Sequence, residues 1–274
     1  MPELPEVESI RRTLAPVLEG RVVLSCEIRH PRMIRYQRGD LRSRILGHRI
    51  ERVRRAGKYL LAELDGERLW VTHLGMSGRV EVTEHLGEEG PHTRVVIGLD
   101  DGREFRLVDP RTFGFIQVLA PEEIGASGVG RLGPDALDAL PPAAELERML
   151  SRRRAAIKTV LLDQTVVAGV GNIYADEILH RAGISPVRQA GGLDDREVSR
   201  LRSSVGPVLR EGLRWNGTSL EDRAYLLPDG RAGEFAAKLR VYGRQDQPCL
   251  TCGTPIRRLV IGGRSSFWCP QCQV

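Results

Sequence analysis

Two cysteine pairs near the end of the chain limit its possible folds more than any other feature. Cys249 and Cys252 are separated by two residues, as are Cys269 and Cys272, and sixteen residues lie between the pairs. Thiolates at this spacing form a tetrahedral structural zinc site of the ribbon type, with no open position for catalysis. Two disulfides are the alternative, but we expect a cytosolic chain, and the fifth cysteine, Cys26, would be left over. We therefore expect one structural Zn²⁺.

The segment between the two pairs, PIRRLVIGGRSSFW, predicts two strands joined at a Gly-Gly turn. Arg264 follows this turn directly, so its side chain would lie near the tip of a β-hairpin, where it can enter a groove. Some zinc ribbons bind nucleic acid, and others bind protein or are purely structural. The zinc module alone therefore leaves the function open.

Basic residues are concentrated in two parts of the chain. Residues 235–274 contain six Lys or Arg and one acid, and residues 29–58 contain eleven Lys or Arg and two acids. The formal net charge of the whole chain is +5. Clusters of this kind neutralise the phosphates of nucleic acid, although a solvated charged surface has the same composition.

The order of the predicted elements indicates two halves of different character. Pro5 and an apolar stripe from Val7 to Leu18 predict an N-terminal helix. Short strands separated by turn signals are predicted at 21–28, 59–64, 69–72, 79–83, 93–99, 104–107 and 114–119. Such strands favour a β-sandwich or barrel. Helical patterns then cover 143–152, 155–162, 172–182 and 193–215.

We therefore expect an α+β multidomain protein. Its parts would be an N-terminal β-sandwich domain at 1–120, a linker at 121–142, a helical domain with a long loop at 143–234 and a zinc-finger module at 235–274. No apolar run reaches the roughly 20 residues that span a bilayer, and the N-terminus lacks the regions of a signal peptide. A cytoplasmic protein without a membrane segment is expected.

The start of the chain, MPELPEVE, offers an uncommon nucleophile. Removal of Met1 before a residue as small as Pro2 would leave a secondary amine. A terminal amine has a pKa near 7.7–8.0, against about 10.4 for lysine, and its attack on an aldehyde-level carbon gives an iminium ion. Glu3 and Glu6 lie beside it, where one can donate a proton and the other can order the amine. Taken alone, the same string is more typical of the first turn of a helix.

Six strings, in order along the chain, closely resemble those of the bacterial formamidopyrimidine-DNA glycosylases. They are MPELPEVE at the start, RRAGKYL at 54–60, THLGMSGR at 72–79, DPRTFGF at 109–115, GVGNIYADEILHRAGISP at 169–186 and VYGRQDQPCLTCGTPI at 241–256. The resemblance runs from residue 1 to residue 272 and so covers essentially the whole chain. It implies a base-excision repair enzyme that acts as glycosylase and AP lyase on 8-oxoguanine and ring-opened purines.

The fold implied by the resemblance is a two-sheet β-sandwich with an N-terminal helix, a helical domain with a helix–two-turn–helix, and a four-cysteine zinc-finger hairpin. The two-turn element would lead into the helix from Asn172, and the loop 216–233 would form a lid over the flipped base. The sequence of this loop departs from the family pattern, so its contacts to the base are not assigned.

The resemblance also implies catalytic roles for five residues. Pro2 would attack C1′ of the damaged nucleotide and form a Schiff base with the opened sugar. Glu3 would protonate the sugar ring oxygen, and Glu6 would support the amine and shape the pocket. Lys58 would donate a proton in β-elimination, and Arg264 would do so in δ-elimination.

Contacts to DNA are implied in the same way. A base in a duplex must be flipped out before an amine can reach it, and the hole must be filled. Phe113 would wedge the base stack, Arg111 would bond the orphaned cytosine, and Met76 would help to fill the void. Phosphate contacts are expected from His73, His92, Arg153, Asn172 and Arg264.

Two other functions fit parts of the sequence. An endonuclease-VIII-like glycosylase for oxidised pyrimidines would share the fold and the proline, but those relatives resemble PEGPE at the start and lack the HLGMSGR and DPRTFGF strings. A non-catalytic zinc-ribbon DNA-binding protein would not need Pro2, Glu3 and Lys58. We therefore expect a monomeric, nucleoid-associated enzyme whose partner is double-stranded DNA with oxidised purines.

Overall fold

The chain forms two compact units, each built from two separate segments. Unit 1 consists of Met1–Arg131 and Trp215–Ala236, and unit 2 consists of Leu132–Arg214 and Ala237–Val274. The computed structural model describes all residues except 1, 36–38, 85–88 and 221–224. Four residues of the predicted lid loop therefore lie outside the described part of the chain.

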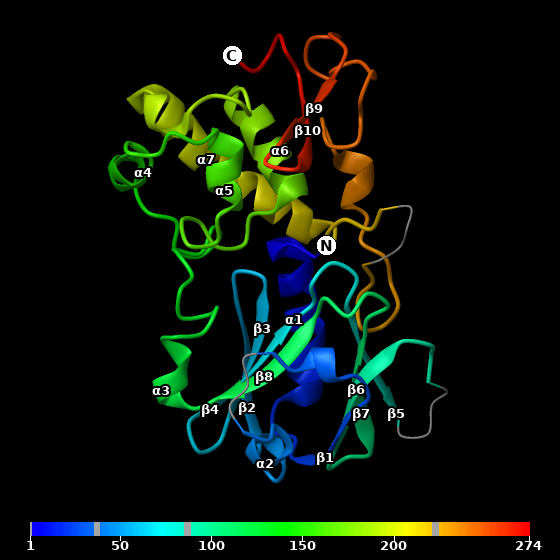
Figure 1. Cartoon of the computed structure of the whole chain (residues 1–274). Coiled ribbons are helices and arrows are strands. Elements are labelled where there is room, and N and C mark those ends of the chain that lie inside the picture. The colour runs from blue at the N-terminus through cyan, green and yellow to red at the C-terminus, as the bar shows by residue number, and fades with distance from the viewer. Residues whose placement is uncertain (1, 36–38, 85–88, 221–224) are drawn as a thin grey trace. The chain divides into compact units, whose positions relative to one another are not determined.

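Two antiparallel four-stranded sheets form most of unit 1 (Figure 1). One sheet has the order β1-β6-β7-β5 and the other has the order β2-β3-β4-β8. The strands are β1 Val23–Ile28, β2 Ile50–Ala56, β3 Tyr59–Leu64, β4 Arg68–His73, β5 Arg79–Glu84, β6 Thr93–Leu99, β7 Arg103–Val108 and β8 Phe115–Leu119. Short helical elements are η1 Pro31–Met33, α2 Arg42–Ile45 and α3 Pro121–Ile124. The two-sheet β-sandwich predicted from the sequence is confirmed.

One strand, β2, was not predicted, and its burial pattern explains why. In this strand only Ile50 and Val53 are buried, three positions apart, and the register of its pairing with β3 shifts between Ile50 and Arg52. A strand normally alternates with a period of two. The bulge breaks this alternation, and the sequence pattern that signals a strand is lost.

Helix α1, Leu4–Leu18, lies in the hydrophobic core of unit 1. Val7, Ile10 and Leu14 are buried in one cluster with Trp70 of β4 and Phe105 of β7, whose rings meet edge to face at 4.8 Å. Burial of each large apolar side chain stabilises the fold by roughly 1.5–3 kcal/mol. The start of α1 is therefore held on a rigid support.

Unit 2 combines helices with a two-stranded hairpin (Figure 1). Its elements are α4 Ala143–Leu150, α5 Ile157–Leu162, α6 Asn172–Ala182, η2 Ala190–Gly192, α7 Asp195–Arg214, β9 Arg257–Ile261 and β10 Arg264–Trp268, and η3 Phe235–Lys238 leads into the zinc module. The helical region and the hairpin predicted from the sequence are confirmed. Among the described residues, no helix is both long and apolar enough to cross a membrane.

Candidate active site and zinc centre

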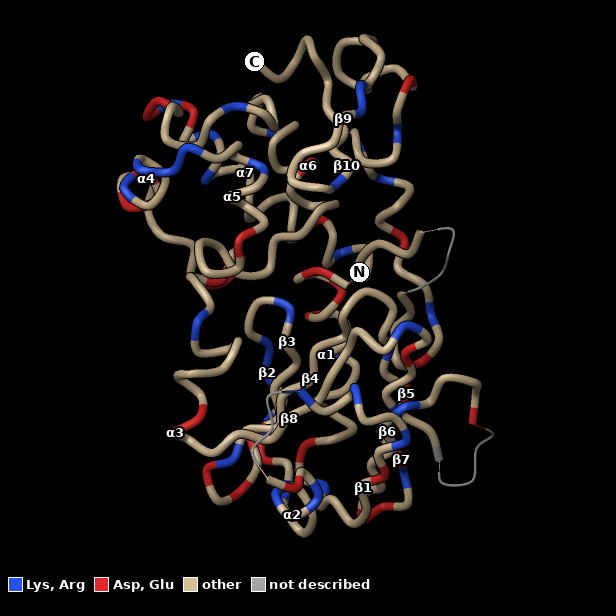
Figure 2. Tube along the Cα trace, viewed as in Figure 1, with Lys and Arg blue, Asp and Glu red and all other residues tan. Residues whose placement is uncertain are grey.

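Pro2, Glu3 and Glu6 lie together at the start of α1, and all three are buried. Glu3 precedes the helix in an extended conformation, and its backbone N–H donates to Oε2 of Glu6 at 2.8 Å. The first N–H groups of a helix have no acceptor within the helix, and the carboxylate of Glu6 supplies one. Figure 2 shows the acidic residues that gather at this end of α1. Pro2 is thus held beside two carboxyl groups.

Lys58 lies in the turn between β2 and β3, after Gly57, and its side chain is buried. Burial, and then the positive charges of Lys58 and Arg35, lower the pKa of His73 to about 4. His73 is therefore neutral at pH 7, and its Nδ1 accepts a hydrogen bond from the N–H of Gly75 at 3.1 Å. A neutral ring of this kind carries its proton on Nε2, which can donate to an anionic oxygen such as that of a phosphate.

Met76 and Phe113 lie on two loops that pack directly against each other. Gly75 has a φ of +60°, and a Cβ at this position would come within 2.5–2.6 Å of the backbone of Phe113 and Gly114. Only glycine permits this approach. Met76 and Phe113 are 44% and 42% exposed, and the guanidinium of Arg111 lies 4.8 Å from the centre of the Phe113 ring. The structure therefore brings together the three residues predicted to fill the void.

Asp109 organises the second of these loops, a role that was not predicted from the sequence. Its side chain is completely buried. Oδ1 accepts from the hydroxyl of Ser77 at 2.6 Å and from the N–H of Arg111 at 3.1 Å, and Oδ2 accepts from the N–H of Gly114 at 2.7 Å. The available signal was the acid that opens the DPRTFGF string, because an Asp before a turn often accepts from the N–H groups that follow it.

His92, which precedes β6, is exposed and has a φ of +79°. Its Nδ1 lies 3.0 Å from a guanidinium nitrogen of Arg94, and Arg94 donates in turn to the carbonyl of Asp109 at 3.0 Å. His92 is therefore connected to the loop that carries Arg111 and Phe113.

In unit 2, Asn172 and Lys158 both contact the backbone next to Arg264. Nδ2 of Asn172 and Nζ of Lys158 donate to the carbonyl of Ser265, at 3.1 Å and 3.0 Å. The N-cap of α6 is Gly171, and no capping hydrogen bond comes from a side chain. Asn172 thus fixes the hairpin rather than capping the helix, and the exposed Arg264 opens β10 beside it.

Arg153 lies just after α4, and its side chain is 39% exposed. Its guanidinium is 3.3 Å from a carboxylate oxygen of Asp163. An exposed ion pair of this kind contributes at most about 1 kcal/mol, so a phosphate can compete for the same guanidinium.

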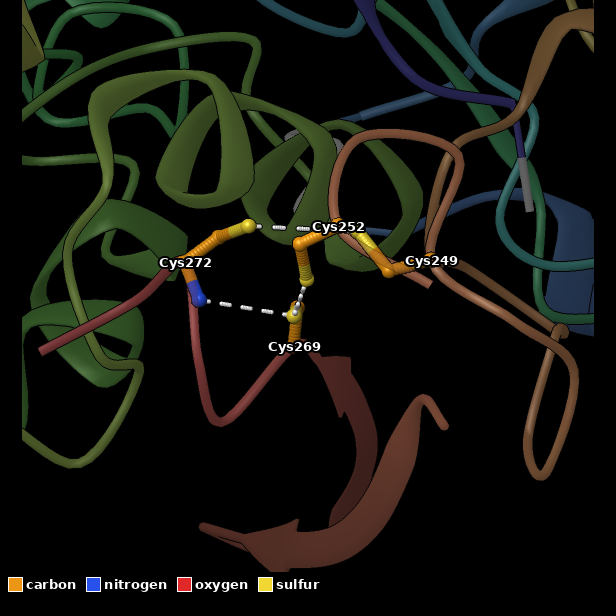
Figure 3. Close-up of side chains that lie close together, drawn as sticks. All are labelled: Cys249, Cys252, Cys269 and Cys272. Atoms are coloured by element: carbon orange, nitrogen blue, oxygen red, sulfur yellow. Dashed lines mark hydrogen bonds between the residues drawn. The ribbon is translucent and has the colours of Figure 1, made fainter. Parts of the chain in front are cut away.

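The sulfur atoms of Cys249, Cys252, Cys269 and Cys272 all lie within 4.8 Å of one another (Figure 3). Sγ of Cys249 is 4.0 Å from that of Cys272, and Sγ of Cys252 is 3.4 Å from that of Cys269. These separations exceed the roughly 2.05 Å of a disulfide. Four Zn–S bonds of about 2.3 Å in a tetrahedron place the sulfurs roughly 3.8 Å apart. The cluster fits one structural zinc ion, with all four positions filled by the protein.

Two acidic side chains of α6 attach the zinc module to this helix, and neither was predicted. Asp176 accepts from the N–H of Phe267 at 2.9 Å. Glu177 accepts from three consecutive N–H groups, those of Arg240, Val241 and Tyr242, at 2.9–3.0 Å. Both carboxyl groups are buried. An acidic pair in the middle of a helix is usually solvated, so the sequence carried no signal for this role.

Three family models match consecutive parts of the chain. The N-terminal domain of formamidopyrimidine-DNA glycosylase matches residues 1–116, and the H2TH domain of formamidopyrimidine-DNA glycosylase matches residues 132–224. A zinc finger found in FPG and IleRS matches residues 246–274. The zinc finger predicted from the cysteine spacing is thus confirmed.

Curated relatives and solved structures match over the full length. Formamidopyrimidine-DNA glycosylases from Rhizorhabdus wittichii and Geobacillus kaustophilus are 44% and 43% identical to the chain, each covering 100% of both proteins. The crystal structure of MutM (Fpg) from Thermus thermophilus has a TM-score of 0.90 at 39% identity, covering 99% of this chain and 98% of that one. Lactococcus lactis Fpg in complex with abasic-site DNA has a TM-score of 0.90 at 28% identity, covering 99% of both chains.

Proposed function

Because the chain belongs to the formamidopyrimidine-DNA glycosylase family, we propose that it excises oxidised purines from duplex DNA and then cleaves the strand at the resulting site. The substrates would be 8-oxoguanine and formamidopyrimidine lesions. Solved complexes of Lactococcus lactis Fpg contain abasic-site DNA and Fapy-dG DNA, which supports both steps. The observation that carries the proposal is the buried start of α1, where Pro2 is adjacent to two carboxyl groups.

In the first step, the free amine of Pro2 would form a bond to C1′ of the damaged nucleotide. The glycosidic bond breaks and its electron pair leaves with the base, which takes up a proton, while the nitrogen of Pro2 gives up its own proton. Glu3 would give a proton to the ring oxygen O4′ as the C1′–O4′ bond opens, leaving an iminium ion between Pro2 and the sugar. An iminium ion is a strong electron sink, and this is the advantage of an amine over water as the nucleophile.

Strand cleavage would follow from the same iminium ion. It acidifies the C2′ hydrogen, whose loss expels the 3′ phosphate in β-elimination, and the 5′ phosphate then leaves in δ-elimination. Lys58 would donate a proton in the first elimination and Arg264 in the second. Hydrolysis of the iminium ion would finally release the sugar fragment and regenerate the amine.

Access to C1′ would require the nucleotide to be flipped out, which costs a few kcal/mol. The loops of Met76 and Phe113 are suited to compensate for this cost, because they hold two exposed apolar side chains beside the guanidinium of Arg111. Insertion of such a side chain between base steps also kinks the duplex. His73, His92, Arg153 and Asn172 would bind phosphates.

Zinc, when bound, closes the two cysteine loops into one module and takes no part in the chemistry. Cys249, Cys252, Cys269 and Cys272 would hold it, and β9 and β10 between them would present Arg264 to the DNA. The monomeric state and the nucleoid-associated cytoplasmic location expected from the sequence stay predictions. Sedimentation of the free protein tests the first, and fluorescence microscopy of a tagged protein tests the second.

Borohydride trapping on a defined duplex tests the nucleophile. Borohydride reduces an iminium ion to a stable amine, so a duplex with one 8-oxoguanine opposite cytosine should give a covalent adduct of one chain and one strand. A duplex with ordinary guanine is the control and should give none. Mass spectrometry of the adduct should place the bond on Pro2, and a chain that retains Met1 should not be trapped.

The same assay separates the alternative functions. Trapping on an oxidised pyrimidine and not on 8-oxoguanine would indicate the endonuclease-VIII-like activity. Binding without any adduct would indicate a DNA-binding protein that is not an enzyme. Full activity of a chain that retains its first methionine would exclude the amine of Pro2 as the nucleophile.

A further inference from the structure

The two carboxylate oxygens of Glu6 contact two segments that lie far apart in the sequence. Oε2 accepts from the N–H of Glu3 at 2.8 Å, and Oε1 accepts from the N–H of Thr218 at 2.7 Å. Glu6 is 2% exposed and Thr218 is 4% exposed. A buried carboxylate that accepts backbone N–H groups forms a strong, charge-assisted contact. Glu6 therefore connects the terminus that carries Pro2 to the segment 215–219.

The turn at Asn216 and Gly217 is shaped to fit this carboxylate. Both residues have positive φ, +55° and +82°, and a Cβ at Gly217 would come within 2.8 Å of Cγ and Oε1 of Glu6. Only glycine combines this conformation with so close an approach. The backbone of the turn thus rests directly on Glu6 and directs the N–H of Thr218 toward it.

The later part of the loop, at Tyr225 and Gly233, contacts the turn at Asn216 and the residue Ser219 that follows it. The hydroxyl of Tyr225 donates to the carbonyl of Asn216 at 2.9 Å. The hydroxyl of Ser219 donates to the carbonyl of Tyr225 at 2.7 Å and accepts from the N–H of Gly233 at 2.8 Å. Burial, and then the negative charge of Glu6, raise the pKa of Tyr225, so its hydroxyl stays a donor at neutral pH. The two ends of the loop are therefore closed against α1.

We propose that Glu6 is a positioning residue that fastens the base of this loop to the start of α1, so that the base pocket and the nucleophile form together. The inference rests on the proposed function, in which the loop covers the flipped base. Excision of a base needs both the base pocket and the amine of Pro2 in place. Cleavage at an abasic site needs the amine but no base pocket, so it depends less on the Thr218 side of the contact.

The chemistry of the side chain makes the proposal testable. Glutamine has the shape of glutamate but offers one oxygen acceptor and one NH₂ donor. In Glu6→Gln, one of the two backbone N–H groups must therefore face a donor. Gly217→Ala disturbs the contact from the other side. Its Cβ would push the turn, whose positive φ it also disfavours, away from Glu6, and the turn takes no part in the bond between Glu6 and Glu3.

Three measurements on the zinc-loaded full chain follow. Amide hydrogen exchange, without DNA, should accelerate by roughly 10- to 100-fold at Thr218 in Gly217→Ala and at Thr218 or Glu3 in Glu6→Gln, as expected for loss of a buried hydrogen bond to a charged group. Single-turnover excision of 8-oxoguanine should fall by a similar factor. Strand cleavage at a preformed abasic site should stay within about twofold in Gly217→Ala, since the lost interaction lies outside the amine's own contacts.

Glu19→Gln is the matched control. Glu19 lies at the other end of α1 and accepts from the N–H of Val53 at 2.8 Å, which the oxygen of a glutamine can still accept, so the same change of side chain is made without touching the loop. Neither exchange at Thr218 nor excision should change in it. If Gly217→Ala folds poorly, Tyr225→Phe releases the same turn by removing the bond to Asn216.

Two results would overturn the proposal. One is protection that persists at both the Glu3 and the Thr218 amides in Glu6→Gln. The other is a released amide together with excision at the wild-type rate. Failure of the proposed function is distinct, because wild-type protein would then excise nothing, whereas the exchange measurement still reports on the Glu6 contact.

Discussion

The ammonium group of Lys158 lies 2.7 Å from a carboxylate oxygen of Asp176, and both side chains are completely buried. Burial raises the pKa of Asp176, and the positive charge of Lys158 opposes this rise. The pair also holds β10, because Lys158 donates to the carbonyl of Ser265 and Asp176 accepts from the N–H of Phe267. The backbone that carries Arg264 is thus fixed from the interior of unit 2.

Asp176→Asn should strongly destabilise the protein. The substitution keeps the shape of the side chain but leaves the ammonium of Lys158 buried without its counter-charge, which costs about 3–5 kcal/mol. Chemical denaturation of the zinc-loaded chain measures the loss. The double variant Lys158→Met with Asp176→Leu removes both charges and should recover part of the stability, because the N–H of Phe267 then loses its acceptor. A loss below about 1 kcal/mol in Asp176→Asn would contradict this account.

The stability should depend on pH through His73. Its pKa is lowered to about 4 in the folded protein, and an unfolded histidine titrates near 6.5, so the unfolded chain binds the proton more readily. The contribution of the neutral His73 to the free energy of unfolding is complete above pH 6.5 and is lost as the pH falls through 6.5 toward 4. It amounts to about 2 kcal/mol once the partial exposure of the ring is allowed for.

Unfolding free energies at pH 7 and pH 4.5 measure this effect. The decrease between the two values should be smaller in His73→Gln than in the wild type, because the glutamine does not titrate. The same substitution at the exposed His92 controls for the loss of a histidine. Equal decreases in the wild type and His73→Gln would show that burial of His73 is not the cause.

The sequence predicted those features of the fold that have a local signal. The cysteine spacing, the apolar stripe of α1 and the Gly-Gly turn before Arg264 each specify a short-range geometry, and the structure has the corresponding elements. The loops of Met76 and Phe113 were identified only through their resemblance to a family. As single residues, exposed apolar side chains carry no such information.

The features that were missed depend on contacts between distant segments. Lys158 and Asp176 are ordinary charged residues in their own helices, and only the packing of α5, α6 and β10 turns them into a buried pair. The same is true of Thr218, whose N–H meets Glu6 from 212 residues away. Local propensity and periodicity do not report which backbone donors a buried carboxylate will find.

Removal of zinc should disrupt the folding of the zinc module in unit 2 and leave unit 1 folded. The core of unit 1 contains α1 and both sheets and includes none of the four cysteines. A chelator should therefore abolish duplex binding while amide protection in α1 persists, because metal binding and folding of the zinc module are coupled. Readdition of Zn²⁺ should restore binding. Loss of protection in α1 on chelation would show that the two units fold as one.

Phe113→Ala should reduce excision without reducing stability. The ring is 42% exposed, so its truncation costs the fold at most about 0.5 kcal/mol. Phe113 is expected to fill the space that the flipped base leaves. Without its ring, the cost of unstacking the base, a few kcal/mol, is no longer compensated, and single-turnover excision of 8-oxoguanine should fall by roughly tenfold or more.

Leu24→Ala is the matched control, because Leu24 of β1 is a more exposed apolar residue, at 62%, outside these loops. Its excision rate and melting temperature should equal those of the wild type. Equal excision rates in Phe113→Ala and Leu24→Ala would remove Phe113 from the group of void-filling residues and leave Met76 and Arg111 to be tested in the same way.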